Sequence, residues 1–389
     1  MTTPVYINRS SSYLPFEPVS NEEMQHILGQ VGGRHSRART VVLRRNGIVS
    51  RHYVIDRTTR RQAMTNAQIC ARAITGLGEL SEVDLLASGT SIPDDALYGL
   101  PYFDQLRPGH AERVHEELHW PRMSVMSFSG ICLSATAALK HAYLALAAGD
   151  ARRAVVTGSE VVSPILQSEA FEPEIEAAKL DELIARPELA FEKDFLRWML
   201  SDGAGAVLLE TEPQPEGNSL RIEWIELSSA AHELPACMYM GADKLPDGKL
   251  LGWASFEREE RPAKSIFAIK QDVRLLNDNI VDKTFGEPLR ILVEKRGITT
   301  SSIDWFLPHL SSKYFFEHCE KKLVELGIPV PRERWFTNLF TRGNTGAASP
   351  FIMLDELMKS GRLKRGERIL MFVPESGRFS NAFVSLVVE

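Results

Sequence analysis

The sequence predicts an α/β protein built from two similar halves. Residues 80–87 resemble residues 300–307, and residues 150–158 resemble residues 365–373. Within the first pair, each segment follows a helical stretch and leads into an apolar strand, which is the pattern of a βα unit. Both pairs recur at an offset of about 220 residues, which indicates that the chain contains the same arrangement of helices and strands twice.

A polar, proline-rich segment at residues 210–219 separates the two repeats and is typical of a linker. We therefore predict an N-terminal half over residues 1–210 and a C-terminal half over residues 220–389. The N-terminal half includes an acidic, helix-prone segment at about residues 166–200. A segment of that length is more typical of a functional lid than of a plain connection, with a surface insertion or a dimer contact as the alternative.

The composition of the 389 residues is that of an ordinary globular protein, and the net charge of −6 does not favour a bulk nucleic-acid binder. The four cysteines lie far apart without a CxxC pair, which argues against a zinc ribbon or a disulfide scaffold and fits a reducing cytoplasm. They are Cys70, Cys132, Cys237 and Cys319. The N-terminus is polar, unlike a signal peptide. Since we find no run of ~18 apolar residues, we expect no transmembrane helix and no membrane partner.

Cys132 lies where a strand is predicted to turn into a helix. Before it, Met126 and Phe128 are apolar at alternate positions; after it, apolar residues recur at helical spacing as far as Gly149. Gly130 allows a sharp turn at the junction. A thiol at a helix N-terminus lies at the positive end of the helix dipole, which favours the thiolate. Cys132 is therefore a candidate nucleophile, and a structural cysteine in a core helix is the alternative.

Two later segments place polar side chains at the ends of predicted elements. An apolar strand ends at Pro308 and His309, so the imidazole is expected at the C-terminal edge of that strand. A glycine-flanked loop at residues 341–349 opens a helix over residues 350–360 and presents the amide of Asn344. A cysteine, a histidine and an asparagine at element ends form a nucleophile with two polar partners.

At this point the sequence resembles the condensing enzymes with the thiolase fold, specifically the β-ketoacyl-acyl-carrier-protein synthase III type. The cysteine, the Pro-His pair and the Gly-Asn-Thr-x-Ala-Ala-Ser motif follow one another in the order and spacing of that family. Other segments that resemble the family are residues 12–15, 20–23, 46–48, 51–52 and 201–206. The resemblance implies a five-layer αβαβα structure, an active site where the two halves meet, a homodimer and no cofactor. Compared with the family pattern, the segment at about residues 166–200 has ~20 extra residues next to the acyl pocket.

The resemblance also implies roles for the site residues. Cys132 would accept an acyl group by transthioesterification. Neutral donors on His309 and Asn344 would stabilise the enolate of the second thioester, and the backbone N–H groups of Cys132 and Gly377 would form the oxyanion hole. In the loop around Gly377 the family has a run of glycines, of which this chain keeps only Gly377.

Glu160 follows the strand after the nucleophile helix, so its carboxylate is a candidate general base. A base there suits a branch of the family that joins a β-ketoacyl and an unsaturated acyl thioester into a cyclohexanedione, as in the dialkylresorcinol and bacterial stilbene pathways. A structural ion pair at the strand end is the alternative for this glutamate. Decarboxylative condensation by an ordinary synthase III of fatty acid or polyketide synthesis is the alternative for the reaction.

Acyl carrier proteins are acidic, so a basic patch is expected near the mouth of the pocket. Lys313, Lys321 and Lys322 lie on the predicted helix after His309, and the lysine pair matches carrier-binding positions in the family; a solvated helix face is the alternative. The tryptophan with which the family contacts coenzyme A is missing before residues 46–48, which favours carrier-bound acyl donors.

Three further interpretations are disfavoured. His115 and His119 read as H-E-x-x-H, but the predicted helix is short and polar and no third ligand follows, so we expect no metal. An acyltransferase on the same fold would be expected to lose His309 or Asn344. A non-catalytic partner subunit would be expected to lose Cys132. All three of these site residues are present.

Overall fold

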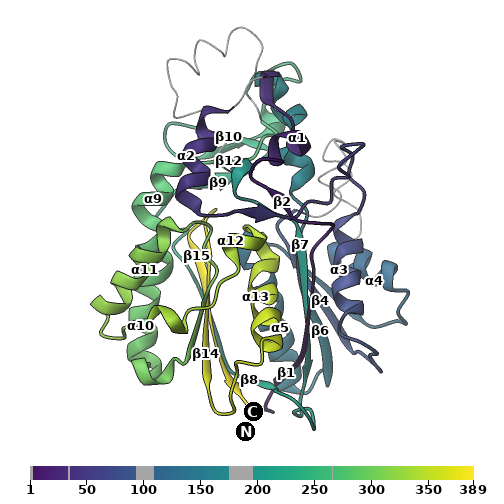
Figure 1. Ribbon diagram of the computed structural model, residues 1–389, viewed down its shortest axis with the longest axis vertical. Helices are drawn as coiled ribbons and strands as arrows, with labels where there is room; N and C mark the ends of the chain where they lie inside the picture. Colours follow the sequence, from purple (N-terminus) through teal and green to yellow (C-terminus); the bar gives the residue numbers. More distant parts are fainter. Residues whose placement is uncertain (1–2, 34–35, 93–108, 175–195, 265) are drawn as a thin grey trace.

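A computed structural model describes residues 3–33, 36–92, 109–174, 196–264 and 266–389. In these residues nine strands form one mixed sheet in the order β13-β14-β15-β8-β1-β7-β6-β4-β5 (Figure 1). The strands are β1 (Tyr6–Tyr13), β4 (Leu85–Thr90), β5 (Ser124–Phe128), β6 (Arg153–Glu160), β7 (Gly203–Glu210), β8 (Leu220–Ser229), β13 (Trp305–Pro308), β14 (Arg368–Glu375) and β15 (Ser380–Val388).

The sheet repeats one pattern of strand pairing. In its first part β4 is parallel to β6, β6 is antiparallel to β7, and β7 is antiparallel to β1. In its second part β13 is parallel to β14, β14 is antiparallel to β15, and β15 is antiparallel to β8. Among the described strands, the two parts are hydrogen-bonded to each other only where Tyr6 and Ile7 of β1 pair with Arg221 and Leu220 of β8. The sheet therefore behaves as two similar sheets joined at one corner.

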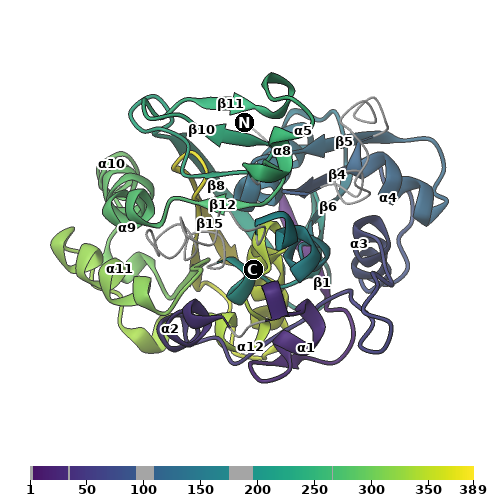
Figure 2. The same ribbon diagram turned by 90° about the horizontal axis from the view of Figure 1, so that it is seen from above.

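Helices form the remaining layers (Figures 1 and 2). Between the two parts of the sheet, α5 (Ser134–Ala148) packs on β4 and β6, while α13 (Ser349–Lys359) packs on β7 and β1. One outer layer contains α3 (Asn66–Thr75) and α4 (His110–Leu118). The other contains α9 (Val273–Val281), α10 (Glu287–Arg296) and α11 (Tyr314–Glu325). This is the five-layer αβαβα arrangement of the thiolase fold, as the sequence predicted.

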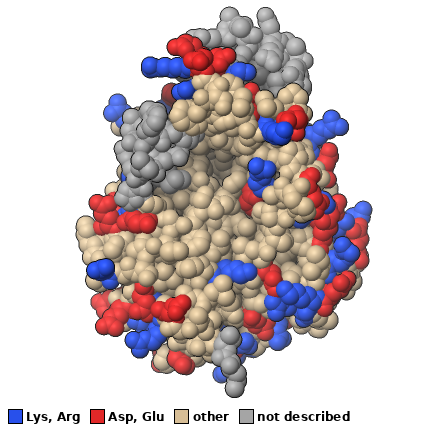
Figure 3. All heavy atoms as spheres, turned by 180° about the vertical axis from the view of Figure 1, so that it is seen from behind, with Lys and Arg blue, Asp and Glu red and all other residues tan. Residues whose placement is uncertain are grey.

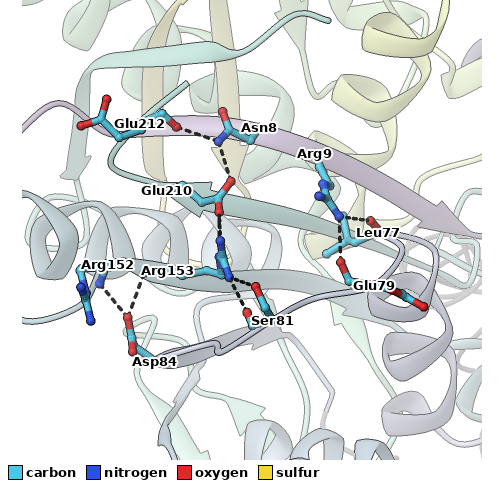
Figure 4. Close-up of polar contacts among 10 residues, drawn as sticks. All are labelled: Asn8, Arg9, Leu77, Glu79, Ser81, Asp84, Arg152, Arg153, Glu210 and Glu212. Atoms are coloured by element: carbon cyan, nitrogen blue, oxygen red, sulfur yellow. Dashed lines mark hydrogen bonds and ion pairs between the residues drawn. The ribbon is translucent and has the colours of Figure 1, made fainter. Parts of the chain in front are cut away.

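The repeat in the sequence corresponds to a repeated capping contact. The Asp84 carboxylate accepts hydrogen bonds from the backbone N–H groups of Arg152 and Arg153 over 2.8 and 3.0 Å at the start of β6 (Figure 4). The Asp304 carboxylate accepts one from the N–H of Arg368 over 2.8 Å at the start of β14. In both places the carboxylate satisfies the first donors of a buried strand. The boundaries of the two halves remain a prediction.

The central helix is unusually apolar. The stretch Ile131–Ala148 is long and apolar enough to cross a membrane by composition, although we expected no such stretch, and 44% of it is buried. A Cβ added to Gly158 of β6 would lie 2.5 Å from the Cβ of Ala135, so the helix and the strand approach closely. Contact with the sheet thus accounts for the apolar, small residues of this helix.

Candidate active site

Cys132 lies in a tight turn between β5 and α5, in the 3-10 helix η4 (Ile131–Leu133), as the sequence predicted. The turn is strained at Ile131 and not only at Gly130, because this β-branched residue has a φ of +50°. The hydroxyl of Ser134 donates to the Ile131 carbonyl oxygen over 2.6 Å and holds the turn in this shape. The thiol of Cys132 is half-buried and free of any disulfide.

His309 directly follows β13, at the edge of the sheet predicted for it. Its backbone N–H donates to the carbonyl oxygen of Phe372 over 2.8 Å, which fixes its position against β14. The ring is 3% exposed, and its Nδ1 atom has no hydrogen-bond partner within the part of the chain that the structure describes. Burial lowers the pKa of His309 to about 4, because the charged imidazolium loses its solvation. The imidazole is therefore neutral near pH 7 and can donate one N–H.

Asn344 lies in the loop before the 3-10 helix η12 (Gly346–Ala348), and contacts from both sides hold it. Its backbone N–H donates to Met199 over 3.0 Å, and its carbonyl oxygen accepts from the N–H of Ser201 over 2.9 Å. Its side-chain Oδ1 accepts from the N–H of Gly346 over 3.0 Å. Since the oxygen is used within the loop, the Nδ2 amide remains as the donor toward the cavity, with the amide orientation assigned from this bond.

Two cavities meet at these residues. The larger one holds about 200 Å³ and contains Glu160 in its wall; we call it the Glu160 cavity. The smaller one holds about 50 Å³ and contains His309; we call it the His309 cavity. Both cavities are lined by Cys132, Asn344, Leu276, Ser311 and Ser376. The nucleophile candidate and the amide thus lie at the junction of two separate spaces.

The walls of both cavities are mainly apolar. In the Glu160 cavity the apolar side chains include Ile92, Val162, Met199, Met240 and Ile269. In the His309 cavity they include Ile280, Phe285, Leu310, Phe315 and Phe372. The second wall includes the π-helix η9 (Asp282–Gly286), an irregularity that is frequent at functional sites. Each cavity therefore suits an apolar chain and presents few polar groups to it.

Glu160 is 1% exposed and is held by donors from two segments. Its Oε2 accepts from the Ser91 hydroxyl over 2.7 Å and from the backbone N–H of Ala347 over 3.1 Å. Its Oε1 accepts from the N–H groups of Ser91 and Ile92 over 3.2 and 3.3 Å. Burial raises the pKa of Glu160 to about 7, although these hydrogen bonds oppose the shift. Its partners in the described ranges are N–H and O–H groups and not a cation, which does not favour an ion pair.

The pKa of the Cys132 thiol is shifted in the direction opposite to the one we predicted. Burial raises its pKa, and the negative charges of Glu160 and Glu375 raise it further. We expected the helix dipole to favour the thiolate, but that effect is confined to about 0.5 elementary charge at the helix end. Loss of solvent and two nearby carboxylates outweigh it, so the resting residue is a thiol.

The predicted oxyanion donor Gly377 is engaged elsewhere. Its backbone N–H donates to the Oε1 atom of Glu375, a buried carboxylate two residues earlier. No sequence pattern singled out Glu375 or its neighbour Ser376, and Ser376 lines both cavities. A signal was present: an acidic residue stands where the resemblance leads one to expect glycine.

The three lysines lie at or on α11, but two of them are paired. Lys321 lies 3.8 Å from Glu325, and Lys322 lies 2.8 Å from Asp282 and 2.9 Å from Glu325. Lys313 is exposed at the N-cap of the helix. The lysine pair therefore offers less positive charge to a partner than the sequence suggested.

The structure also locates the H-E-x-x-H segment and part of the segment predicted as an insertion. His119 lies past the end of α4 with a φ of +52°, and the ring of His115 lies 3.0 Å from the carbonyl oxygen of Pro121. Across the described ranges no three His, Cys, Asp or Glu side chains are grouped to hold a metal ion. Most of the segment predicted as an insertion, residues 175–195, lies outside the described residues. Its last part does contribute Leu196 and Met199 to the Glu160 cavity.

Comparison with known proteins supports the resemblance. Residues 293–384 match the family described as 3-oxoacyl-[acyl-carrier-protein (ACP)] synthase III C terminal. The chain is 25% identical over 365 residues to the β-ketoacyl-[acyl-carrier-protein] synthase III of Xanthomonas campestris pv. campestris (strain 8004), covering 93% of this chain and 92% of that protein.

Solved structures share the fold over the whole chain. The tetronic acid condensing enzyme AbyA1 matches with a TM-score of 0.73 at 21% identity, covering 98% of this chain and 99% of that one. The synthase III FabH from Pseudomonas aeruginosa PAO1 matches with a TM-score of 0.71 at 19% identity, covering 99% and 98%. The chain is thus similar over nearly its whole length to β-ketoacyl-acyl-carrier-protein synthase III, and it has the thiolase fold of these condensing enzymes.

Proposed function

We propose that this condensing enzyme joins two acyl thioesters through an acyl group bound to Cys132, and that the product is a cyclohexanedione of specialised metabolism. The observation that carries the proposal is the junction of two apolar cavities at Cys132 and Asn344. One cavity can hold the acyl chain on the cysteine while the other holds the chain of the second substrate. A malonyl unit, by contrast, brings no second apolar chain.

In the first step the Cys132 sulfur attacks the carbonyl carbon of the acyl thioester. The carbonyl electrons move to the oxygen, and the tetrahedral intermediate then collapses with loss of the donor thiol. The proton of the Cys132 thiol ends on the departing thiol, so no net charge is left behind. Because the resting residue is a thiol, this proton transfer belongs to the loading step.

In the second step a carbanion on the second thioester attacks an electrophilic carbon of the enzyme-bound chain. Its enolate oxygen carries negative charge, which the N–H of the neutral His309 and the Nδ2 of Asn344 stabilise by donation. Neither donor is a cation, so neither needs to be deprotonated in order to act. This explains how the two side chains assist carbon–carbon bond formation.

Glu160 is the proposed base for that carbanion. The methylene of a β-ketoacyl thioester is acidic, so the carboxylate can remove its proton and no carbon dioxide need be lost. A pKa of about 7 matches such a task near neutral pH. The carbanion adds to the unsaturated chain, and the enolate that forms there takes the proton back from Glu160. Glu160 then removes a proton from the carbon on the other side of the ketone, and this second carbanion attacks the Cys132-bound carbonyl carbon. The carbon–sulfur bond breaks, and the Cys132 sulfur takes up the proton that Glu160 holds. Glu160 lines the same cavity as Cys132, which supports this assignment.

Two alternative reactions would give different products. A decarboxylative synthase III would consume a malonyl carrier protein, release carbon dioxide and form a linear β-ketoacyl product. An acyltransferase would pass the Cys132-bound group to oxygen or nitrogen, and would not need the two enolate donors. The buried base and the second apolar cavity favour the ring-forming condensation.

We further propose that acyl carrier protein delivers the substrates in the cytoplasm and that the enzyme is a homodimer. Lys313 is the exposed candidate for carrier binding, since Lys321 and Lys322 have acidic partners. For the dimer, β5 is the last strand of the sheet and its outer edge pairs with no other described strand, and nearby Met126 and Leu144 are 41% and 53% exposed. The face on that side carries few charged side chains at its centre (Figure 3).

The experiment that tests the function is intact-protein mass spectrometry with a panel of acyl thioesters, followed by product analysis. We expect an α,β-unsaturated acyl carrier protein to load Cys132 and a β-ketoacyl carrier protein then to yield a cyclic product. A linear β-ketoacyl product formed from malonyl carrier protein with release of carbon dioxide would instead identify an ordinary synthase III. An ester or amide product would identify an acyltransferase.

A further inference from the structure

The hairpin between β14 and β15 is organised around the carboxylate of Glu375. This side chain is 4% exposed. Its Oε1 accepts the N–H of Gly377, its two oxygens accept the N–H of Arg378 over 3.2 and 3.1 Å, and its Oε2 accepts the N–H of Ser380 over 3.4 Å. Three backbone donors of the turn are thus directed onto one carboxylate and away from the cavities.

Ser376 lies in the same turn, and its side chain can contact a substrate. It lines both the Glu160 cavity and the His309 cavity, as Cys132 does. Its hydroxyl makes no side-chain hydrogen bond within the described part of the chain, whereas the hydroxyl of Ser380 in the same hairpin donates to Ser229 over 2.8 Å. Ser376 therefore has a free hydroxyl at the place where the two cavities meet.

The turn is held directly against the nucleophile. A Cβ added to Gly377 would lie 2.3 Å from the Cδ1 of Ile131, the residue before Cys132, and 2.5 Å from the Oε1 of Glu375. From the other side, the Gly377 carbonyl oxygen accepts the backbone N–H of Cys237 over 2.8 Å. With contacts on both sides, the turn cannot rotate its Gly377 amide toward the thioester without breaking the bonds to Glu375 and Cys237.

We propose that the Ser376 hydroxyl, in place of the Gly377 N–H, is the second oxyanion donor at Cys132, and that Glu375 is the positioning residue that turns Ser376 toward the cavities. The inference deepens the proposed function and rests on acyl loading of Cys132. When the Cys132 sulfur forms its bond to the thioester carbon, the carbonyl electron pair moves to oxygen. The Ser376 O–H and the Cys132 N–H donate to that oxygen until the bond to the leaving thiol breaks.

The first test compares acylation with alkylation. Ser376→Ala should lower the rate of acyl loading by about 10²–10³, the usual effect of removing one oxyanion donor. Iodoacetamide alkylates the same sulfur by direct displacement without forming an oxyanion, so its rate in Ser376→Ala should equal that of the wild type. The matched control is Ser385→Ala, which removes from β15 a hydroxyl that donates to Glu223 and not to Glu375, and this variant should load within twofold of the wild type.

The second test concerns Glu375. In Glu375→Gln one acceptor oxygen becomes an N–H donor, so the turn is no longer held and acyl loading should fall. The same change removes a negative charge near Cys132, whose other charged neighbour is Glu160, while His309 is neutral. The pH midpoint of iodoacetamide alkylation should therefore move to lower pH, an effect that mere loss of packing would not give.

The outcomes separate the inference from the function on which it rests. Wild-type loading rates in Ser376→Ala, or equal losses of acylation and alkylation, would overturn the role of Ser376. Acyl loading at the wild-type rate in Glu375→Gln would overturn the positioning role of Glu375. A wild type that accepts no acyl thioester at Cys132 would instead refute the proposed function itself.

Discussion

Glu160 accepts a hydrogen bond from the backbone N–H of Ala347 over 3.1 Å, so a carboxylate at the end of β6 holds the loop that carries Asn344. The intervening Gly346 has a φ of +51°, and a Cβ added there would lie 2.4 Å from the Oε2 of Glu160. The proposed base, Glu160, therefore helps to position the proposed enolate donor, Asn344, although 184 positions of the sequence separate the two residues.

The first prediction concerns the nucleophile. Cys132→Ala should abolish covalent acyl loading, because no other thiol lies at the junction of the two cavities. Intact-protein mass spectrometry with peptide mapping measures this. Cys319→Ala is the control, since Cys319 lines the His309 cavity but not the Glu160 cavity, and it should load normally, as should Cys70→Ala and Cys237→Ala. An acyl adduct on the Cys132→Ala protein would contradict the assignment.

The second prediction concerns the enolate donors. His309→Ala and Asn344→Ala should still acquire the acyl group but lose about 10²–10³ in the rate of carbon–carbon bond formation. Because the pKa of His309 is held near 4, its protonation should not limit the reaction above about pH 5. Separate measurement of loading and of product by mass spectrometry checks both statements. Condensation at the wild-type rate by Asn344→Ala would remove this residue from the mechanism.

The third prediction concerns Glu160 and pH. Burial raises its pKa from 4.5 to about 7, so between these values the folded protein binds more protons than the unfolded chain. The free energy of unfolding should therefore fall as pH rises through this window, by about 3 kcal/mol in total for this group. Urea unfolding of the wild type and of Glu160→Gln across pH 4.5–8 measures the difference, since other buried acids contribute equally to both.

The same variant tests catalysis. If Glu160 is the base, the wild-type condensation rate should rise with pH up to about 7, where the carboxylate becomes ionised. Glu160→Gln should keep acyl loading but lose cyclic product by about 10²–10⁴, the usual effect of general-base assistance. Cyclic product at the undiminished rate in Glu160→Gln would leave this residue with a structural role only.

The fourth prediction concerns the two cavities. Met240→Trp should fill the Glu160 cavity, and Val281→Phe should narrow the His309 cavity. If the cavities hold two different acyl chains, both variants should lower condensation, but only one of them should lower acyl loading. Loading and condensation assays on long-chain and short-chain substrates distinguish the cases. Equal effects of the two variants on both steps would show that one chain occupies both cavities.

The fifth prediction concerns the H-E-x-x-H segment. Elemental analysis of the purified protein should find no stoichiometric zinc, because His119 lies beyond the helix that carries His115. Treatment with a chelator should leave acyl loading and condensation unchanged. One zinc per chain, lost together with activity on chelation, would revive a metal-dependent function.

The local pattern of the sequence determined the elements that carry the candidate site. Alternating and helical apolar periods predicted the strand, turn and helix around Cys132, and the ends of apolar segments predicted the positions of His309 and Asn344. The similarity of the segments around Asp84 and Asp304 predicted two similar halves. The structure adds that both carboxylates accept hydrogen bonds from N–H groups at the start of a neighbouring strand. Periodicity acts over a few residues, so it can be recognised without the fold, whereas the capping contacts join residues that lie 68 and 64 positions apart.

Only the tertiary structure decided the electrostatics and the donors of the site. The thiol of Cys132 is not activated by its helix, because chain folding buries it and brings Glu160 and Glu375 near it from two other strands. The Gly377 amide is taken by Glu375, and Lys322 is paired with Asp282, through contacts that no local pattern encodes. Burial and charge pairing depend on which distant segments of the chain are in contact, and only the fold determines those contacts.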